Sequence, residues 1–273
     1  MRVRSWMGVA LPVIAYLLLV AMPGLGQSSS VYKAPRTPDG RPDLSGIWQA
    51  MTEANWNLEA HPAAPAAVIA NGAMFAIPPG AGVVEGGEIP YLPEARKKQQ
   101  ENFASRQKLD PENKCYMGGV PRSTYMPYPF QIVQNPRKIL FAYEFAGAVR
   151  SVNMGAPTDP PADSWMGWSN GKWEGDTLVI DVKGLNDQTW FDRAGNFHSD
   201  ALHVVERYTP RSPDTLNYEA TIEDPKTFSR PWKISMPLYR RVEKDAHLME
   251  FKCVEFSEEF LYGHLRRGAP QGK

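Results

Sequence analysis

Residues 164–232 decide the fold, and they read SWMGWSNGKWEGDTLVIDVKGLNDQTWFDRAGNFHSDALHVVERYTPRSPDTLNYEATIEDPKTFSRPW. Three runs in this stretch alternate apolar and polar residues with a period of two, which is typical of strands that bury one face. The runs are Thr177–Lys183, Ala201–Tyr208 and Thr215–Glu223. Glu-Gly-Asp at 174–176 and Ser-Pro-Asp at 212–214 are turn sequences beside them. The stretch therefore predicts an antiparallel β meander.

Further strand-like runs lie on both sides of this stretch. They are Leu44–Gln49, Phe130–Gln134, Lys138–Phe145, Ala148–Met154, Trp232–Tyr239 and His247–Glu255. Together with the central runs they indicate roughly nine or ten strands, most of them joined by short turns. This pattern predicts a mainly β domain in which an antiparallel meander closes into a barrel. A sandwich of two sheets is the alternative.

The first of these runs contains Gly46-Ile47-Trp48. This Gly-x-Trp is similar to the opening strand of lipocalins and other calycins, in which the tryptophan plugs one end of the barrel. The resemblance implies a lipocalin-like barrel closed at one end by Trp48. The alternative is that Trp48 is an ordinary core residue, because tryptophan is highly buried on average.

Residues 50–114 differ from the rest and are predicted to be an insertion of loop and helix. Ala50–Gly87 is rich in alanine, proline and glycine, which fits a long covering loop. Pro93–Gln107 predicts one helix, because Pro93 suits the first turn, Glu94 suits its positive end and strong helix formers follow. Few of its residues are apolar, so the helix is expected to lie on the surface.

Composition is compatible with one domain over residues 44–264, between an extended tail at 27–43 and a flexible tail at 265–273. Hydrophobic residues make up 42% of the 273 residues, which is enough to build a substantial core. The formal net charge is +0, so the sequence lacks the basic footprint of a nucleic-acid-binding protein. A neutral protein favours small or apolar ligands over polyanions.

Residues 1–26 have the pattern of a secretory signal peptide. Two arginines precede the uncharged apolar run Leu11–Met22, and small residues stand before Gln27 as at a cleavage site. The apolar run is shorter than the roughly 20 residues that a membrane-spanning helix needs. The sequence therefore predicts a periplasmic or secreted protein without stable membrane insertion after cleavage. An uncleaved anchor is the alternative.

The chain has two cysteines, Cys115 and Cys253. In an oxidising compartment such a pair is more naturally a disulfide than a redox or metal site. A bridge would join the middle of the chain to the run predicted as its last strand. Two separate buried thiols are the alternative, since free cysteine is commonly buried.

Six blocks of the sequence resemble a family of exported bacterial proteins that has no established activity. The blocks are PDLSGIW (42–48), CYMGGVPR (115–122), PYPFQIVQ (127–134), GKWEGDTLVIDV (171–182), FHSDALHVVERY (197–208) and YEATIEDPKTFSRPW (218–232). The resemblance implies export and a β-rich fold, and both cysteines belong to its pattern. The family usually has a proline where this chain has Met117 or Gly118, which leaves the shape of that loop open.

Residues 190–207 carry the best candidates for chemistry. His198 and Asp200 precede a predicted strand, and Asp200 is placed to orient His198 for general acid–base work. Glu206 alternates with apolar residues and is expected to point inward, where burial raises the pKa of a carboxyl. These three are the candidate catalytic residues. In the alternative, Asp200 caps the turn and Glu206 forms a structural ion pair with Arg150 across the barrel.

Four residues are candidates for contacting a ligand: Tyr143, Arg150, Trp190 and Asp192. Arg150 is the expected partner of Glu206 across the barrel, and Tyr143 is expected to donate a hydrogen bond to it. Aromatic side chains are dense in this part of the chain and can line an apolar pocket for a small apolar or aromatic molecule. The alternative is that most of these aromatics form the core of the barrel.

No metal or cofactor site is predicted. His198, Asp200, His203 and Glu206 are ligand types, but His203 and Glu206 point to opposite faces of a strand and cannot share an ion. The sequence also has no nucleophile elbow, P-loop or dinucleotide-binding glycine motif.

Three functions stay open from the sequence. The first is an exported barrel protein that binds a small, largely apolar molecule. The second is a cofactor-free isomerase, lyase or hydrolase that uses His198, Asp200 and Glu206, and the third is an envelope scaffold without a ligand. An open cavity would favour binding, and a cavity reached by both His198 and Glu206 would favour an enzyme.

Overall fold

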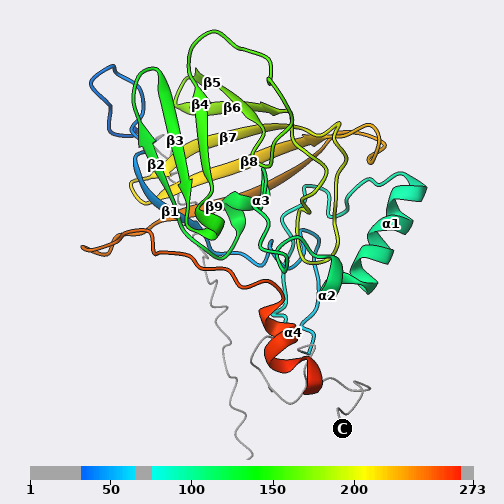
Figure 1. Ribbon diagram of the computed structural model, residues 1–273. Helices are drawn as coiled ribbons and strands as arrows, with labels where there is room; N and C mark the ends of the chain where they lie inside the picture. Colours follow the sequence, from blue (N-terminus) through cyan, green and yellow to red (C-terminus); the bar gives the residue numbers. More distant parts are fainter. Residues whose placement is uncertain (1–31, 66–75, 266–273) are drawn as a thin grey trace, which may run out of the picture. The chain divides into compact units, whose positions relative to one another are not determined.

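A computed structural model describes residues 32–65 and 76–265, in which nine strands close into a barrel (Figure 1). The strands are β1 (Gly46–Ala50), β2 (Phe130–Gln134), β3 (Lys138–Tyr143), β4 (Val149–Asn153), β5 (Trp168–Glu174), β6 (Thr177–Lys183), β7 (His203–Ser212), β8 (Thr215–Glu223) and β9 (Trp232–Arg240). The predicted barrel is therefore confirmed. The signal peptide predicted at residues 1–26 lies outside the described residues.

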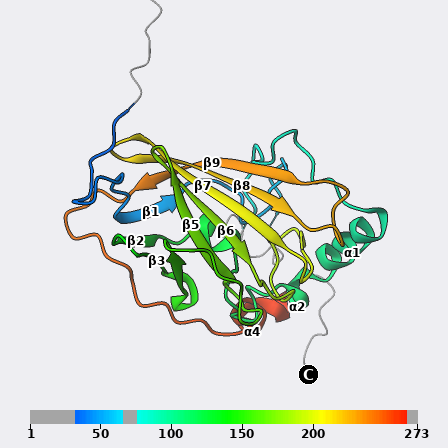
Figure 2. The same ribbon diagram turned by 90° about the horizontal axis from the view of Figure 1, so that it is seen from above.

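The described helices are short and lie outside the barrel wall. They are α1 (Pro93–Ala104), α2 (Arg106–Leu109), α3 (Arg122–Tyr125), α4 (Ser257–Tyr262) and the 3-10 turns η2 (Phe145–Gly147) and η3 (Gly263–Leu265). The helix predicted over 93–107 is confirmed, although it breaks at Ser105 between α1 and α2. Figures 1 and 2 both show α1 beside the barrel, as its few apolar residues predicted.

The strands follow one another around the barrel in sequence order, and β9 pairs with β1 to close it. All of these pairs are antiparallel except β4–β5, which is parallel and consists of only Val152↔Ser169 and Asn153↔Asn170. The expectation of a purely antiparallel meander is therefore wrong at this seam. Residues 154–167 are the cause, because they form a long crossover, which parallel neighbours require, instead of a tight turn.

Individual strands were predicted with uneven success. β2, β6 and β8 have the predicted bounds, and β7 begins two residues later than expected. β5 was not predicted, because its sequence WSNGKWE lacks regular apolar alternation. The strand predicted at His247–Glu255 is wrong. Since β9 already pairs with β1, the closed barrel leaves no edge for a tenth strand.

One end of the barrel is closed by Trp48 on β1. Its ring is buried, and its indole N–H donates a hydrogen bond to the Leu44 carbonyl at 2.9 Å. The guanidinium of Arg240, at the end of β9, lies 4.2 Å from the centre of the ring. Trp48 therefore lies in the packed interior beneath a cation, a position that fits an ordinary core tryptophan as well as the lipocalin-like Gly-x-Trp.

The other end of the barrel is covered by α3, whose four residues are all buried. The Tyr125 hydroxyl donates to the Phe191 carbonyl at 2.8 Å, and the Thr124 hydroxyl lies 3.4 Å from that of Tyr208 inside the barrel. The isolated bridge Val84↔Ile234 also holds the 50–114 insertion against β9. Side chains from loops thus plug this end of the barrel.

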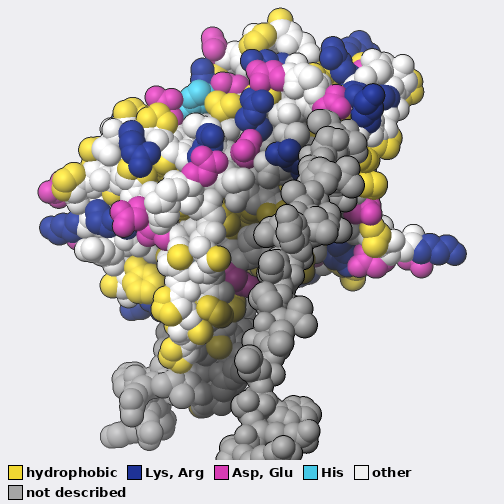
Figure 3. All heavy atoms as spheres, turned by 180° about the vertical axis from the view of Figure 1, so that it is seen from behind, with side chains coloured by type: hydrophobic (Ala, Val, Ile, Leu, Met, Phe, Trp, Pro, Cys, Tyr) yellow, Lys and Arg dark blue, Asp and Glu magenta, His cyan; other side chains and the backbone are white. Residues whose placement is uncertain are grey.

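Two general features of the described chain bear on function. No helix in residues 32–65 and 76–265 has the length and apolar character needed to cross a membrane. Over the described part of the face in Figure 3, positive and negative side chains are interspersed. This distribution offers no large field of one sign on that face.

Candidate functional site

Arg150 on β4 and Glu206 on β7 form a buried ion pair inside the barrel. Arg150 Nη1 donates to Glu206 Oε2, and neither residue is accessible to solvent. The second carboxylate oxygen, Oε1, accepts hydrogen bonds from the hydroxyls of Tyr208 and Tyr218 at 3.0 and 2.8 Å. The predicted inward face of β7 and the predicted pairing with Arg150 are both confirmed.

Tyr143 does not donate to Glu206, contrary to expectation. Its hydroxyl is buried and has no partner with hydrogen-bond geometry among the described residues. Tyr218 takes the place that was assigned to Tyr143, and the sequence analysis missed it. The register contained the necessary signal, because Glu206 faces Ala220 and Tyr218 is therefore its diagonal neighbour on β8.

The buried positive charge of Arg150 is balanced by the negative charge of Glu206. Burial opposes the charge of Arg150, but Glu206 beside it raises the pKa of the guanidinium well above its ordinary value. Burial also raises the pKa of the Tyr208 and Tyr218 hydroxyls, so both stay protonated and can donate. Glu206 is fully buried and lines none of four pockets formed by described residues. A catalytic role for Glu206 stays a prediction.

His198 lies in the loop before β7 and is buried as a neutral imidazole. Its Nδ1 is 2.9 Å from the Ser199 carbonyl, which can only accept, so Nδ1 carries the proton. Nε2 then accepts a hydrogen bond from the Thr189 hydroxyl at 2.7 Å. Burial lowers the pKa of the imidazole below its ordinary value of 6.5. Both ring nitrogens are therefore already engaged by the protein.

Asp200 does not orient His198, so this part of the predicted catalytic arrangement is wrong. Its carboxylate is exposed and accepts a hydrogen bond from the Lys226 ammonium at 2.6 Å. The loop is instead held by Asp224, which accepts from the Ser199 amide at 2.7 Å and from the Ser199 hydroxyl at 2.8 Å. Because Asp224 fixes the loop from another strand end, Asp200 turns to solvent.

Asp192 is fully buried between the 190–198 loop and the 50–114 insertion. It accepts hydrogen bonds from the amides of Leu58 at 2.8 Å, Ala194 at 2.9 Å and Asn196 at 3.3 Å. The side-chain amide of Asn196 also donates to it at 2.6 Å. Burial nevertheless raises the pKa of this carboxyl to about 7. Asp192 therefore fastens two loops together.

The candidate site residues fall into two separate groups. Arg150, Glu206 and Tyr143 meet inside the barrel, whereas Trp190, Asp192 and His198 belong to the buried loop that covers one end. Trp190 pairs with Phe197 across a short bridge in that loop. The four ligand-contact candidates thus do not line one common pocket of the described chain.

Cys115 and Cys253 form the predicted disulfide, with their Cα atoms 5.7 Å apart. Cys253 lies in the irregular segment after β9 and not in a last strand. The bridge therefore fastens the C-terminal segment, together with contacts such as that between the rings of Phe145 and Phe251 at 4.8 Å.

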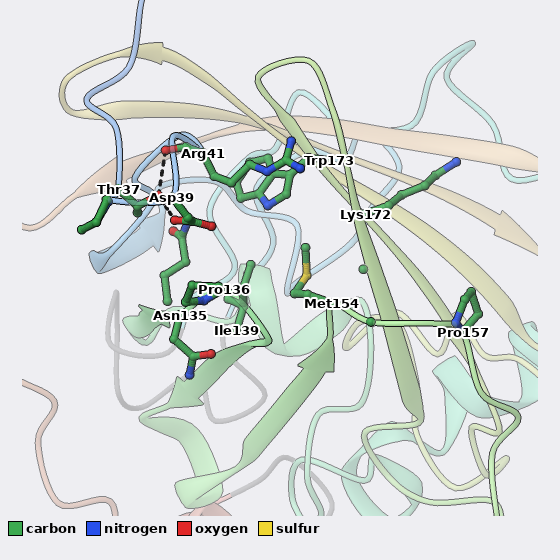
Figure 4. Close-up of a pocket in the computed structure, with 14 residues that line it drawn as sticks. Thr37, Asp39, Arg41, Asn135, Pro136, Ile139, Met154, Pro157, Lys172 and Trp173 are labelled. Atoms are coloured by element: carbon green, nitrogen blue, oxygen red, sulfur yellow. Dashed lines mark hydrogen bonds between the residues drawn. The ribbon is translucent and has the colours of Figure 1, made fainter.

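A pocket of about 940 Å³ opens at the Trp48 end of the barrel, where β4 and β5 separate (Figure 4). We call it the barrel-end pocket. It is lined by Thr37, Pro38, Asp39, Arg41, Gln134, Asn135, Pro136, Ile139, Met154, Gly155, Pro157, Gly171, Lys172 and Trp173. All seven residues of β5 pair with β6, but only two pair with β4. The parting of β4 from β5 after this short contact leaves space for the pocket.

The inner wall of the barrel-end pocket is apolar. Ile139 belongs to the buried core, and Met154 and Trp173 are half-buried residues that pack against that core. Figure 4 shows Met154 and Trp173 facing the same space from the two strands that separate. The part-buried side chains of Met154 and Trp173 thus present apolar surface to anything that enters.

The outer wall of the barrel-end pocket is a turn of the N-terminal segment. Gln134 holds this segment, because its side chain accepts from the Leu44 amide at 2.9 Å and donates to the Pro42 carbonyl at 2.8 Å. Arg36 and Asp176 form a further ion pair at 2.9 Å to the β5–β6 turn. The expected extended tail is here a turn closed by the bridge Arg36↔Pro42.

Three charged side chains line the barrel-end pocket. Lys172 pairs with Glu174 at 2.8 Å, and Figure 4 shows its side chain directed away from the pocket. Asp39 accepts a hydrogen bond from the Thr37 hydroxyl at 2.5 Å. Arg41 extends toward Trp173 in Figure 4, and its guanidinium has no ion pair or hydrogen bond within the described chain.

Within the described ranges, no group of three or more His, Cys, Asp or Glu residues is placed to hold a metal ion. Sequence comparison gives no further assignment, because no family model and no curated protein matches the chain.

Proposed function

We propose that this protein is an exported barrel protein that binds a small, largely apolar molecule in the barrel-end pocket. The observation that carries the proposal is the apolar wall of Ile139, Met154 and Trp173 in an opening of about 940 Å³. Pockets for small molecules typically have roughly 300–1,000 Å³ and mostly apolar linings with a few polar groups. The barrel-end pocket fits the volume range, and its lining sets this apolar wall against six polar or charged residues.

Export is supported by two separate features of the chain. Residues 1–26 have the sequence pattern of a cleaved signal peptide, and the Cys115–Cys253 disulfide is compatible with an oxidising compartment. The six sequence blocks that resemble exported bacterial proteins support the same location. A ligand-binding protein at this location would handle molecules outside the cytoplasm.

The packed interior supports a ligand at the barrel end rather than at the barrel centre. Inward side chains such as Phe141, Val152 and Tyr218 are completely buried and belong to one continuous core. At the barrel end, in contrast, Trp173 keeps part of its surface available. Covering such an apolar surface is favourable by about 25 cal/mol for each Å² removed from water, and a ring can stack on the indole.

The test is binding of the neutral fluorescent probe N-phenyl-1-naphthylamine to the purified protein. We expect saturable binding that Trp173→Ala weakens by about tenfold or more, because the variant removes the aromatic wall. Trp168→Ala is the matched control, since Trp168 lies on the outer face of the same strand and does not line the pocket. An absence of binding, or equal binding by Trp173→Ala and the wild type, would overturn the proposal.

A further inference from the structure

We infer that the ligand of the barrel-end pocket is an apolar organic acid whose anionic group binds Arg41. The inference rests on the proposed function and specifies the chemical class of its ligand. It starts from the contrast between the apolar wall at Trp173 and the unengaged guanidinium of Arg41 on the opposite wall of the same pocket.

Arg41 differs from Lys172, Arg36 and Arg240 at this end of the barrel, because each of those three is engaged by the protein. Lys172 pairs with Glu174, and Arg36 pairs with Asp176. Arg240 lies over the Trp48 ring and donates to the Ser45 carbonyl at 2.7 Å. Within the described chain, Arg41 is thus the pocket cation whose donors are available to a ligand.

The backbone of Arg41 is held in place even though its guanidinium is not. The Arg41 carbonyl accepts a hydrogen bond from the Thr37 amide at 2.8 Å. The next residue, Pro42, is fixed by the side chain of Gln134. A side chain that starts from an anchored backbone loses less conformational freedom on binding, which favours affinity.

The guanidinium selects for a particular kind of anion. It presents a planar fork of N–H donors that matches the two oxygens of a carboxylate in a bidentate arrangement. An acid with an aromatic or aliphatic body can place that body against Met154 and Trp173 and its carboxylate at Arg41. The Asp39 carboxylate also lines the pocket and opposes an anion there, so Asp39→Asn should tighten binding of the acid.

The test uses two probes of the same shape, naphthalene-2-carboxylate and naphthalene-2-carboxamide, in isothermal titration calorimetry near neutral pH. We expect the wild type to bind the carboxylate more tightly. Arg41→Gln should weaken binding of the carboxylate about three- to tenfold, because it removes a partly exposed charged contact. It should leave the affinity for the carboxamide unchanged. Lys172→Gln is the matched control and should change neither affinity, because Lys172 is directed away from the pocket.

The outcomes separate this inference from the proposed function. Equal affinity for both probes, or equal weakening of both by Arg41→Gln, would overturn the anionic ligand and leave the apolar pocket intact. Failure of both probes to bind, or binding that Trp173→Ala does not change, would overturn the proposed function and the inference together.

Discussion

The guanidinium of Arg150 and the carboxylate of Glu206 are paired across the interior of the barrel, although they stand 56 residues apart. They come from β4 and β7, which are not neighbours in the barrel wall. The pair therefore joins two sides of the molecule through its core. Removing two charges from water costs several kcal/mol for each ion, which their attraction and added hydrogen bonds must offset.

Glu206→Gln should lower the free energy of unfolding by roughly 3–5 kcal/mol, because it leaves the Arg150 charge buried and uncompensated. Urea denaturation of the variant and the wild type measures this difference. Glu219→Gln is the matched control, since Glu219 lies on the outward face of β8. The double change Arg150→Met with Glu206→Leu should recover much of the loss. Unchanged stability with lost probe binding would instead indicate a functional Glu206.

The alternation in β7 was sufficient to predict that Glu206 is buried, because three apolar neighbours on its face need the core. The sequence was also sufficient to nominate Arg150 as the ion-pair partner of Glu206. The position of Asp200 could not be predicted in the same way, because the loop conformation is fixed by Asp224, 25 residues away from Ser199. The alternation of apolar and polar residues thus predicted which face of a strand is buried. It did not predict the direction of side chains in a loop.

The barrel-end pocket was beyond prediction for a related reason. It depends on the path of residues 154–167, on the two-pair contact between β4 and β5, and on a turn of the segment predicted as an extended tail. Each of these is a contact between distant parts of the chain. The turn sequence Pro38-Asp39-Gly40 was visible, but nothing local indicated that Arg41 would face Trp173.

Asp192 should make stability fall as pH rises from about 4 to about 7. Burial raises the pKa of its carboxyl from the ordinary value of 3.8 to about 7, so the folded state keeps a proton that the unfolded state has released. The unfolded state binds fewer protons over this window, and the free energy of unfolding therefore decreases with pH. The contribution amounts to roughly 4 kcal/mol over the whole window.

Urea denaturation near pH 5 and near pH 8 checks this dependence. Asp192→Asn cannot titrate, so its stability should fall less steeply with pH than that of the wild type across that interval. The exposed Asp159→Asn is the control for general effects of a lost carboxylate. If the free energy of unfolding varied with pH in the same way in Asp192→Asn and in the wild type, the Asp192 proton would not contribute to the pH dependence of stability.

His198 should be neutral at pH 7 with its proton on Nδ1. Burial lowers the pKa of the imidazole, and the Ser199 carbonyl requires a donor at that nitrogen. Because the unfolded chain takes up a proton below about pH 6.5, this residue lowers stability as pH falls through that range. Long-range ¹H–¹⁵N correlation spectra of the imidazole identify the tautomer. An imidazolium at pH 7 would contradict the assignment.

The Cys115–Cys253 disulfide should account for all cysteine in the purified protein. Alkylation of the unfolded, non-reduced chain should therefore modify no thiol, and two modified cysteines would contradict the pairing. Cys115→Ser combined with Cys253→Ser opens a loop of 138 residues. The chain-entropy estimate for such a loop is about 5 kcal/mol of lost stability, as an upper value. Urea denaturation of the double variant compared with the wild type measures the loss.

Gly171 should tolerate no larger side chain, because it lies where β4 and β5 make their short contact. A Cβ atom there would stand 2.5 Å from Met154 Sδ and 2.6 Å from Val152 Cγ1. Gly171→Ala should therefore lower stability by roughly 1–3 kcal/mol and push Met154 into the barrel-end pocket, which weakens binding of N-phenyl-1-naphthylamine.

Two further variants test whether this crowding causes the loss of stability expected in Gly171→Ala. Adding Met154→Ala to Gly171→Ala should restore part of the lost stability, since it removes the nearer of the two contacts and leaves only Val152. Gly155→Ala is the matched control, because it also lines the pocket but would bring its Cβ no closer than 3.3 Å to Asn153 Oδ1. Equal destabilisation by Gly155→Ala and Gly171→Ala would show that the loss arises from backbone freedom in this region and not from contact between β4 and β5.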